Sequence, residues 1–305
     1  MTIDAPLLLR AAAAAAGGQQ YPAGALYVVA TPIGNLADLS LRAIHVLSLV
    51  DALACEDTRV SAALLHHLGI DKARPLLAVH GHNEREAAAA VLTRLARGER
   101  VGYVSDAGTP AVSDPGAALV ATAQAAGFRV VPIAGPSSAL AALSVAGDAS
   151  AGGFACVGFL SARAGERAEQ LGRIAGAVPT QIVFEAPHRI AALLQALAAA
   201  CPARRITLCR ELTKQFETVE TLRAAKLPAW LAADANRSRG EFVLVLHALE
   251  PIAIDEAAAT TERLLATLLR ELPLKQAVAL AAELSGAPRN ALYKRALELR
   301  DSQRQ

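Results

Sequence analysis

The sequence is poor in aromatic residues and has no paired-cysteine pattern. Phe, Trp and Tyr make up 4% of the 305 residues, although 53% are hydrophobic. The apolar content is therefore mostly Ala, Leu and Val, which suits helices packed on a buried parallel sheet. Cys55, Cys156, Cys201 and Cys209 show no C-x-x-C spacing. Cys55 and Cys156 lie in apolar runs, and we expect them to be buried free thiols.

Strong net charge, long uncharged apolar runs and a metal-binding pattern are also missing. The 30 basic and 28 acidic residues leave a net charge of +2, too small for a nucleic-acid coat protein but compatible with an enzyme that meets RNA through a local patch. Nothing reads as a membrane span or a signal peptide, so we expect a cytoplasmic protein with a disordered extension over residues 1–23. His80 and His82 stand close together, but no ligand spacing completes a zinc pattern, and we predict no metal.

Residues 24–146 alternate short apolar runs with amphipathic segments of helical length. This alternation predicts an α/β domain with a parallel sheet. The expected strands are residues 25–30, 51–55, 76–80, 101–105 and 129–133, and the expected helices lie near 39–49, 58–68, 84–97 and 116–126.

A second α/β domain is predicted over residues 147–250, with the Gly, Ala and Ser-rich stretch 147–153 as the seam. Its expected strands are residues 154–159, 181–185, 205–209, 217–222 and 242–247, and its expected helices are 166–175, 190–200 and 223–233.

Residues 251–305 change character. A linker is expected over residues 251–258, followed by helical periodicity with no strand signal. Residues 274–284 and 289–299 are typical of a helix-turn-helix, because Gly286 suits the turn and Pro288 can begin the second helix.

Small and polar residues follow the predicted strands of the first domain. Ligands bind outside the carboxyl ends of the strands in an open parallel sheet, so this edge is the expected binding site. Asp114, with Pro115 after it, and Ser137 are explained as helix caps. Asp106 beside Gly108 is not, and an acidic side chain beside a glycine suits a ligand with an amine-bearing tail.

Three common catalytic patterns do not occur in the sequence. G-x-G-x-x-G does not follow the first strand, and neither G-x-x-x-x-G-K-[ST] nor G-x-S-x-G is present. A dinucleotide dehydrogenase, a P-loop nucleotide hydrolase and a serine hydrolase of the usual kind are therefore disfavoured.

Several runs together resemble one family. L-Y-V-V-A-T-P-I-G-N-L at residues 26–36, C-E-D-T-R at 55–59, H-N-E at 82–84, S-D-A-G-T-P at 105–110, F-E-A-P-H-R at 184–189 and R-E-L-T-K at 210–214 closely resemble the bacterial ribosomal RNA cytidine-2′-O-methyltransferases. The resemblance runs from about residue 25 to the C-terminus. It implies the tetrapyrrole-methylase fold, S-adenosylmethionine held between two α/β domains, a homodimer, and a cytidine in the decoding region of 16S ribosomal RNA as substrate, within the 30S subunit.

Carried onto this sequence, the resemblance gives candidate residues for each task. The cofactor candidates are Thr31, Pro32, Gly34, Asp106, Ala107, Gly108, Thr109, Pro110, Gly135, Pro136 and Phe184. A general base is needed for the hydroxyl, and Glu185, Lys214 and Glu56 stay open as catalytic candidates. RNA contacts are expected from Arg59, His188, Arg189, Arg210, Arg289, Lys294 and Arg295, with structural ion pairs or a solvated helix face as the plain alternative.

Two other functions remain to be weighed. A tetrapyrrole C-methyltransferase would keep the fold, but this chain has residues 31–36 where those enzymes commonly carry a glycine-rich acidic loop, and it adds the C-terminal helices. A non-enzymatic nucleic-acid-binding regulator would leave the polar edge of the first domain unexplained.

Overall fold

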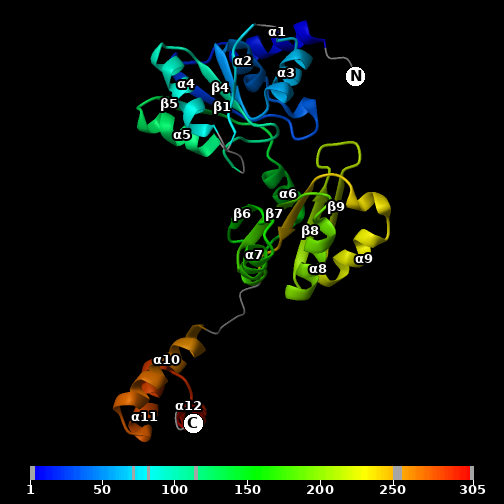
Figure 1. Ribbon diagram of the computed structural model, residues 1–305. Coiled ribbons are helices and arrows are strands. Elements are labelled where there is room, and N and C mark those ends of the chain that lie inside the picture. Colours follow the sequence, from blue (N-terminus) through cyan, green and yellow to red (C-terminus); the bar gives the residue numbers. More distant parts are fainter. Residues whose placement is uncertain (1–3, 71–72, 81–82, 113–115, 250–255, 303–305) are drawn as a thin grey trace. The chain divides into compact units, whose positions relative to one another are not determined.

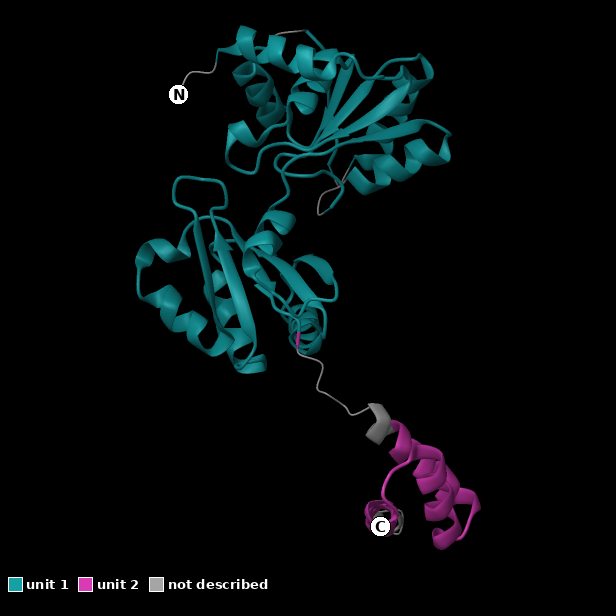
Figure 2. Ribbon diagram, turned by 180° about the vertical axis from the view of Figure 1, so that it is seen from behind, with its two compact units in different colours: residues 1–248 teal, residues 249–305 magenta. Residues whose placement is uncertain are grey.

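The computed structural model describes residues 4–70, 73–80, 83–112, 116–249 and 256–302 (Figure 1). The chain divides into two compact units, residues 1–248 and 249–305, coloured separately in Figure 2. The first unit contains two five-stranded sheets. The predictions for Asp114, Pro115 and His82 and for most of the linker fall outside the described residues.

The first sheet is parallel throughout, as predicted. Its strands are β1 (Ala25–Val29), β2 (Ala52–Cys55), β3 (Leu76–Ala78), β4 (Val101–Val104) and β5 (Arg129–Ile133). Their spatial order is β3-β2-β4-β1-β5, and every neighbouring pair runs in the same direction. The carboxyl ends of all five strands therefore meet at one edge, where the sequence places its small and polar residues.

Helices cover both faces of this sheet (Figure 1). Successive side chains of a strand point to opposite faces, so Tyr27 joins a core with α2 (Leu41–Leu49) and α3 (Thr58–His67). Leu26 instead joins a core with α4 (Glu84–Ala96) and α5 (Gly116–Ala125). Both residues are fully buried. Burial on both sides explains why these strands are apolar runs rather than alternating ones.

The structure corrects the predicted disordered extension over residues 1–23. Helix α1 spans Ala5–Ala16, and the Asp4 carboxylate caps it by accepting a hydrogen bond from the Leu7 N–H (3.0 Å). Ala12 is 1% exposed and belongs to the core shared with α2. The alanine run resembles a low-complexity tail, but alanine is the strongest helix former and its small side chain permits close packing on a neighbour.

The second sheet is mixed. Its strands β6 (Phe154–Phe159), β7 (Thr180–Glu185), β8 (Arg205–Arg210), β9 (Thr218–Arg223) and β10 (Phe242–Leu246) lie in the order β6-β7-β10-β8-β9. Strands β6 and β7 are parallel, whereas β10, the last strand among the described residues, inserts between β7 and β8 and is antiparallel to both. The amino end of β10 therefore lies beside the carboxyl ends of its two neighbours.

Helices also cover both faces of the second sheet. Helices α7 (Ala164–Gly176), α8 (Ile190–Ala200) and α9 (Leu227–Ala232) share a core with one face. Helix α6 (Ser138–Ala146), capped by Ser137 as predicted, packs its buried alanines on the other face. The predicted boundary at residue 146 assigns α6 to the first domain, but its packing places it with the second.

Strand β6 lies at an edge of the second sheet, and its side chains are more exposed than expected. Cys156 is exposed there, which corrects the prediction that it is buried, while Cys55 is buried as expected. Phe154 and Phe159 on the same strand are also exposed. An edge strand lacks a neighbour on one side, so an apolar sequence run does not guarantee burial.

Residues 249–305 form a separate helical unit. Helices α10 (Glu256–Glu271), α11 (Leu274–Ser285) and α12 (Arg289–Ser302) share a small core around Leu265, Val278 and Leu292. Gly286 ends α11 in the left-handed conformation, with φ of 72°, and Pro288 immediately precedes α12. The predicted helix-turn-helix is confirmed. Among the described residues, no helix is both long and apolar enough to cross a membrane.

Candidate active site

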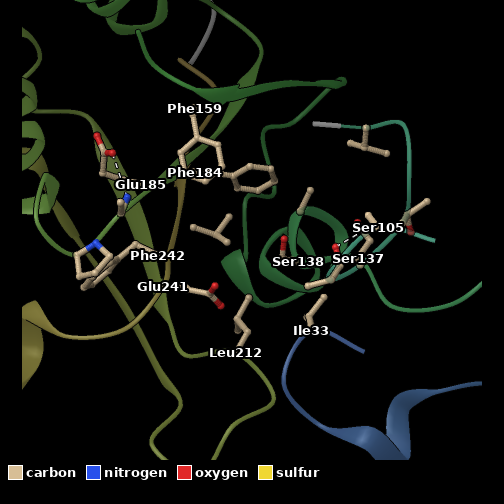
Figure 3. A pocket seen from close by; sticks show the side chains of 18 of the residues that line it. Ile33, Ser105, Ser137, Ser138, Phe159, Phe184, Glu185, Leu212, Glu241 and Phe242 are labelled. Carbon is tan, nitrogen blue, oxygen red and sulfur yellow. Dashed lines mark hydrogen bonds between the residues drawn. The ribbon is translucent and has the colours of Figure 1, made fainter. Parts of the chain in front are cut away.

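A cavity of about 380 Å³ opens at the edge where the carboxyl ends of the first sheet meet the second sheet (Figure 3). The loops after β1, β2 and β4 supply part of its wall, and β6, β7, β10, α6 and the loop after β8 supply the rest. Its lining is mainly apolar with a few polar groups, which is the usual character of a small-molecule site. The lining residues are Ile33, Glu56, Ser105, Ala107, Gly108, Thr109, Val112, Ser137, Ser138, Ala139, Phe159, Phe184, Glu185, Ala186, Pro187, Leu212, Glu241, Phe242 and Val243.

Backbone hydrogen bonds hold the loops after β1 and β4 together. The Thr31 N–H donates to the Gly108 carbonyl (2.9 Å), and the Gly108 N–H donates to the Thr31 carbonyl (3.1 Å). Gly108 has φ of 81°, which favours glycine. The Thr109 hydroxyl donates to the Pro136 carbonyl (2.9 Å) and so ties in the loop after β5. The predicted loops do come together, and backbone hydrogen bonds join them.

Strand β10 brings to the cavity residues that sequence reasoning missed. Phe242 pairs with Glu185 of β7 and Val243 pairs with Phe184, so Glu241 and the two residues after it lie at the cavity wall. The prediction considered only carboxyl ends of strands, whereas an antiparallel strand contributes its amino end. No local signal in residues 241–243 predicts their position at the cavity wall, because that position depends on the pairing of β10 with β7.

Two phenylalanines form an aromatic corner of the cavity. The rings of Phe159 and Phe184 meet edge to face, with centroids 5.6 Å apart (Figure 3). Phe184 was predicted as a cofactor residue, whereas Phe159, at the end of β6, was missed. Edge-to-face pairs leave ring surface available for a flat ligand group.

Glu185 is buried in a tight ionic cluster. Its side chain is inaccessible to solvent, and Oε2 accepts from Arg167 Nη2 (2.7 Å) while Oε1 lies 3.1 Å from Arg189 Nε. Oε1 also accepts the Ala186 N–H (3.0 Å). Arg189 additionally donates to the Leu160 carbonyl (2.6 Å). Both oxygens of Glu185 are thus engaged, an arrangement that favours a brace for this corner of the cavity over a group that accepts a substrate proton.

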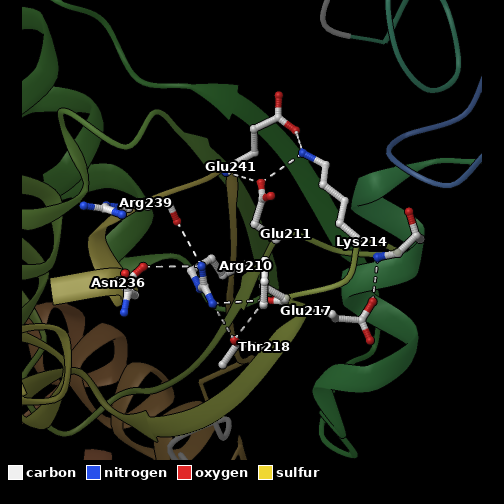
Figure 4. Close-up of polar contacts among 10 residues, drawn as sticks. Arg210, Glu211, Lys214, Glu217, Thr218, Asn236, Arg239 and Glu241 are labelled. Atoms are coloured by element: carbon white, nitrogen blue, oxygen red, sulfur yellow. Dashed lines mark hydrogen bonds and ion pairs between the residues drawn. The ribbon is translucent and has the colours of Figure 1, made fainter. Parts of the chain in front are cut away.

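Lys214 lies in a second ionic cluster, shown in Figure 4. Its Nζ is 2.9 Å from both Glu211 Oε1 and Glu241 Oε2. Burial lowers the pKa of Lys214, but the two carboxylates outweigh burial and leave the pKa above its ordinary value. A lysine base needs a lowered pKa, so this geometry favours a permanent cation.

The aliphatic part of Lys214 passes directly over Gly34 in the loop after β1. A Cβ at residue 34 would lie 2.8 Å from Lys214 Cε, closer than real Cβ contacts come. Gly34 therefore has a steric role, because it lets a side chain from the second sheet cross the loop of the first.

The R-E-L-T-K run at residues 210–214 has an unusual backbone. Glu211 has φ of 52° and Thr213 has φ of 67°, conformations that β-branched and long side chains rarely adopt. Arg210 braces the run by donating to the Arg239 carbonyl (3.2 Å) and the Phe216 carbonyl (3.0 Å) (Figure 4). Backbone strain of this kind persists where the surroundings overdetermine the conformation, commonly at functional sites.

Carboxylates gather where β2 and β4 end. Asp106 Oδ1 accepts the Asp57 N–H (3.0 Å), and Glu56 Oε2 accepts the Asp106 N–H (3.3 Å). Burial raises the pKa of the Asp106 carboxyl, and the neighbouring Asp57 charge adds to this effect. Asp57 is different, because its hydrogen bonds from Arg59 hold its pKa at about 2. Asp57 also begins α3 by accepting the Arg59 N–H (2.8 Å).

The structure divides the predicted cofactor residues into groups. Ala107, Gly108, Thr109 and Phe184 line the 380 Å³ cavity together with the catalytic candidates Glu56 and Glu185. Thr31, Pro32, Gly34 and Asp106 line a second cavity of about 280 Å³ beside it. Pro110, Gly135 and Pro136 line neither of these two cavities. Gly135 instead lets its loop approach β1, since a Cβ there would lie 3.0 Å from the Ala30 Cβ.

The predicted RNA-binding residues also differ from one another. Arg189 and Arg210 are occupied by bonds inside the protein, as described above, which favours structural roles for them. Arg59 is 89% exposed although paired with Asp57, and His188 is exposed. In the C-terminal unit Arg289 and Lys294 are exposed, whereas Arg295 pairs with Glu262 and with Glu298 (2.8 Å). The charge of Arg295 is therefore largely balanced by one carboxylate of α10 and one of its own helix.

Known proteins agree with this fold. A family described as Tetrapyrrole (Corrin/Porphyrin) Methylases matches residues 25–228, and one described as RsmI C-terminal HTH domain matches residues 255–300. Among solved structures, a uroporphyrin-III C-methyltransferase from Thermus thermophilus complexed with S-adenosylhomocysteine is 18% identical, with a TM-score of 0.52 over 73% of this chain and 97% of that one. At this identity the likeness concerns the fold, which is that of the tetrapyrrole methylases.

Closer relatives identify the group within that fold. A ribosomal RNA small subunit methyltransferase I from Pseudomonas aeruginosa is 48% identical over 90% of this chain and 98% of its own length. One of the same name from Xylella fastidiosa is 49% identical over 88% of this chain and 98% of its own length. The chain belongs to the tetrapyrrole methylases and, within them, to the family of ribosomal RNA small subunit methyltransferase I.

Proposed function

We propose that this protein transfers a methyl group from S-adenosylmethionine to the ribose 2′-oxygen of a cytidine in the decoding region of 16S ribosomal RNA. The observation that carries the proposal is the 380 Å³ cavity, whose wall includes residues 105, 107–109 and 184–187, within a chain whose relatives of similar length are named as small-subunit ribosomal RNA methyltransferases.

The cavity suits S-adenosylmethionine in shape and charge. The Phe159 and Phe184 corner offers aromatic surface for an adenine ring. Glu56 places a carboxylate on the wall, which complements the positive sulfonium and amine of such a ligand, whereas the charge of Glu241 is balanced by Lys214. The homologous fold that holds S-adenosylhomocysteine supports the same assignment. Bound there, S-adenosylmethionine would supply the methyl group as an electrophile.

The protein must orient the ribose hydroxyl and remove its proton, because a neutral alcohol is a weak nucleophile. Of the three catalytic candidates, Glu56 fits the role of base best. It lines the cavity beside Ser105, at the end of a rigid buried strand. Glu185 serves as the brace between Arg167 and Arg189, and Lys214 as a cation paired with Glu211 and Glu241.

We further infer that the protein works as a homodimer on the 30S subunit in the cytoplasm, where ribosomes are assembled. Large apolar side chains are exposed on β6 and α6, including Phe154, Leu140 and Val145. Exposed apolar side chains on an edge strand favour a protein partner. Arg289 and Lys294 on α12 offer phosphate contacts that need not read sequence.

A tetrapyrrole substrate is the second candidate, since solved neighbours of the fold methylate uroporphyrin III or cobalt precorrin-4. Two observations favour RNA instead. The relatives at 42–49% identity are named ribosomal RNA small subunit methyltransferase I. The C-terminal helices match the family described as RsmI C-terminal HTH domain.

The deciding experiment maps ribose methylation in small-subunit RNA by mass spectrometry. Purified protein and S-adenosylmethionine are added to 30S subunits from a strain that lacks the activity, and in parallel to the same RNA stripped of protein. We expect one new ribose methyl, on a decoding-region cytidine, in the 30S sample. Intact cofactor binding without methylation of either sample, together with turnover of a porphyrinogen, would replace this proposal with the tetrapyrrole one.

A further inference from the structure

The second cavity, of about 280 Å³, is lined by residues of the first α/β domain alone. Residues of the loops after β1 and β4 and of helix α3 line it, and the second sheet contributes none of the lining residues described for it. These residues are Thr31, Pro32, Gly34, Leu36, Val60, Ser61, Leu64, His67, Ser105 and Asp106. Its size approaches the lower end of the range for small-ligand sites, about 300 Å³.

The two cavities adjoin at a wall that the backbone fixes. Ser105 lines both of them. The Thr31 hydroxyl donates to the Ser105 carbonyl (3.2 Å), and Thr31 is bridged to Gly108 by the two backbone hydrogen bonds between the β1 and β4 loops. Methyl transfer requires donor and acceptor atoms roughly 3–3.5 Å apart and in line. Two compartments that share Ser105 would bring a cofactor in one and a nucleotide in the other next to each other.

The walls of the second cavity suit a flat ring with one polar edge. Pro32, Val60 and Leu64 supply apolar surface, and Asp106 supplies a hydrogen-bond acceptor. Among pyrimidines, cytosine presents an exocyclic amine that donates to Asp or Glu, whereas uracil presents a carbonyl oxygen at the same position. A carboxylate here would therefore select cytosine and repel uracil.

The first turn of the helix that lines the cavity contains an arginine, Arg59, paired to Asp57 (Nη2 to Oδ2, 2.6 Å). Arg59 directly precedes Val60 in the first turn of α3, and its side chain is 89% exposed. An exposed guanidinium in the first turn of the lining helix is suited to the phosphate of the same nucleotide or its neighbour, in exchange for its pairing with Asp57. The α3 face thus offers contacts for both ends of a single extruded nucleotide.

We propose that the 280 Å³ cavity receives the target nucleotide of the RNA, flipped out of its stack, with Asp106 accepting a hydrogen bond from the exocyclic amine of cytosine. This assignment rests on the proposed function and names the site and the base selectivity within it. The cofactor then occupies the larger cavity, and the ribose hydroxyl lies at the wall formed by Ser105.

The test fills each cavity separately. Val60→Trp places a large ring in the second cavity from a position that is 43% exposed, so the fold tolerates it. Val112→Trp is the matched control, because Val112 is similarly exposed and lines the larger cavity. We expect Val60→Trp to bind S-adenosylmethionine like the wild type by calorimetry while kcat/KM for 30S subunits falls at least about a hundredfold. Val112→Trp should lose cofactor binding.

A readout that does not depend on methylation uses free nucleotides. Saturation-transfer NMR of the full chain with S-adenosylhomocysteine should detect cytidine 5′-monophosphate more strongly than uridine 5′-monophosphate, and Val60→Trp should abolish both signals. Asp106→Asn keeps an oxygen for the Asp57 N–H but adds a donor. The preference for cytidine over uridine should therefore fall by about tenfold.

The two proposals fail in different ways. A cytidine signal that Val60→Trp removes, in a wild-type protein that methylates no RNA, supports the pocket and contradicts the proposed function. Wild-type methylation that Val60→Trp leaves unchanged overturns the pocket and supports the function. Unchanged base preference in Asp106→Asn overturns the role of Asp106.

Discussion

The ionic cluster around Glu185 permits a test that separates a brace from a catalytic base. The perturbation is Glu185→Gln, which keeps the size of the side chain. Both carboxylate oxygens face guanidinium groups, of Arg167 and of Arg189. The glutamine oxygen can accept from one of them, and the glutamine NH₂ must then face the other, so a donor meets a donor.

The magnitude follows from burial. Removing one partner of a fully buried pair costs about 3–5 kcal/mol. The Glu185 side chain is inaccessible, but those of Arg167 and Arg189 are 18% and 24% exposed, so solvent relieves part of the loss. We therefore expect the free energy of unfolding to fall by about 2–3 kcal/mol. For a unit of this size the melting temperature should fall by about 4–12 °C.

The assay combines urea denaturation with steady-state methylation of 30S subunits. A brace predicts the loss of stability together with a kcat that stays within about tenfold of the wild type at saturating substrates, since no proton transfer is lost. A base predicts the opposite, an unaltered free energy of unfolding and a kcat lowered by roughly a hundredfold to ten-thousandfold. That second result would refute the structural reasoning.

Arg167→Gln is the matched control, because this substitution removes the other partner of the same ion pair. Arg167 lies on α7 and is not among the residues that line the cavity. It should lose a similar amount of stability. Combining it with Glu185→Gln should cost less than the sum of the two, since the pair shares one interaction. Fully additive losses would show that the two side chains act independently.

Three further expectations concern other contacts. The raised pKa of Lys214 means that, while Glu211 and Glu241 are ionised, their pairing with Lys214 contributes fully below the ordinary lysine pKa of about 10.4 and is lost as pH rises through the folded value. The stability difference between wild type and Lys214→Met, by urea denaturation, should thus be constant at neutral pH and shrink in strong alkali. Gly34→Ala should displace Lys214 and lower the methylation rate, and it should cost less in a Lys214→Ala background than in the wild type, because alanine removes the Cγ, Cδ and Cε atoms that the added Cβ would meet. Gly286→Ala should destabilise the helix-turn-helix by about 1–2 kcal/mol, visible as faster amide hydrogen exchange in α11, because φ is 72° there.

Much of the first domain follows from the sequence because its rules are local. Apolar runs bounded by turn residues identified β1 to β5, and the parallel order places their carboxyl ends at one edge by geometry alone. Gly286 and Pro288 mark the turn of the C-terminal unit for the same reason, since their backbone preferences do not depend on distant residues.

The parts that escaped prediction depend on tertiary placement. Residues 5–16 look like a low-complexity tail until Ala12 is seen buried against α2. Glu241 and Phe242 reach the cavity because β10 inserts antiparallel between β7 and β8, which strand signals in the sequence do not specify. Glu185 resembles a catalytic carboxylate at a strand end, and only the positions of Arg167 and Arg189 reveal that it is enclosed.

The strained R-E-L-T-K run shows how the two halves of the site are held at a fixed spacing. The positive φ values of Glu211 and Thr213 each cost about 1–3 kcal/mol, so other contacts must maintain them. Two sets of contacts do so. Arg210 donates hydrogen bonds to the Arg239 and Phe216 carbonyls, and Lys214 forms an ion pair with Glu211. The conformation carries Lys214 across Gly34, which belongs to the other sheet. Relaxing the strain would move Lys214 off that loop and change the distance between the two cavity walls. The strain is therefore the means by which a loop of the second sheet fixes the position of a loop of the first.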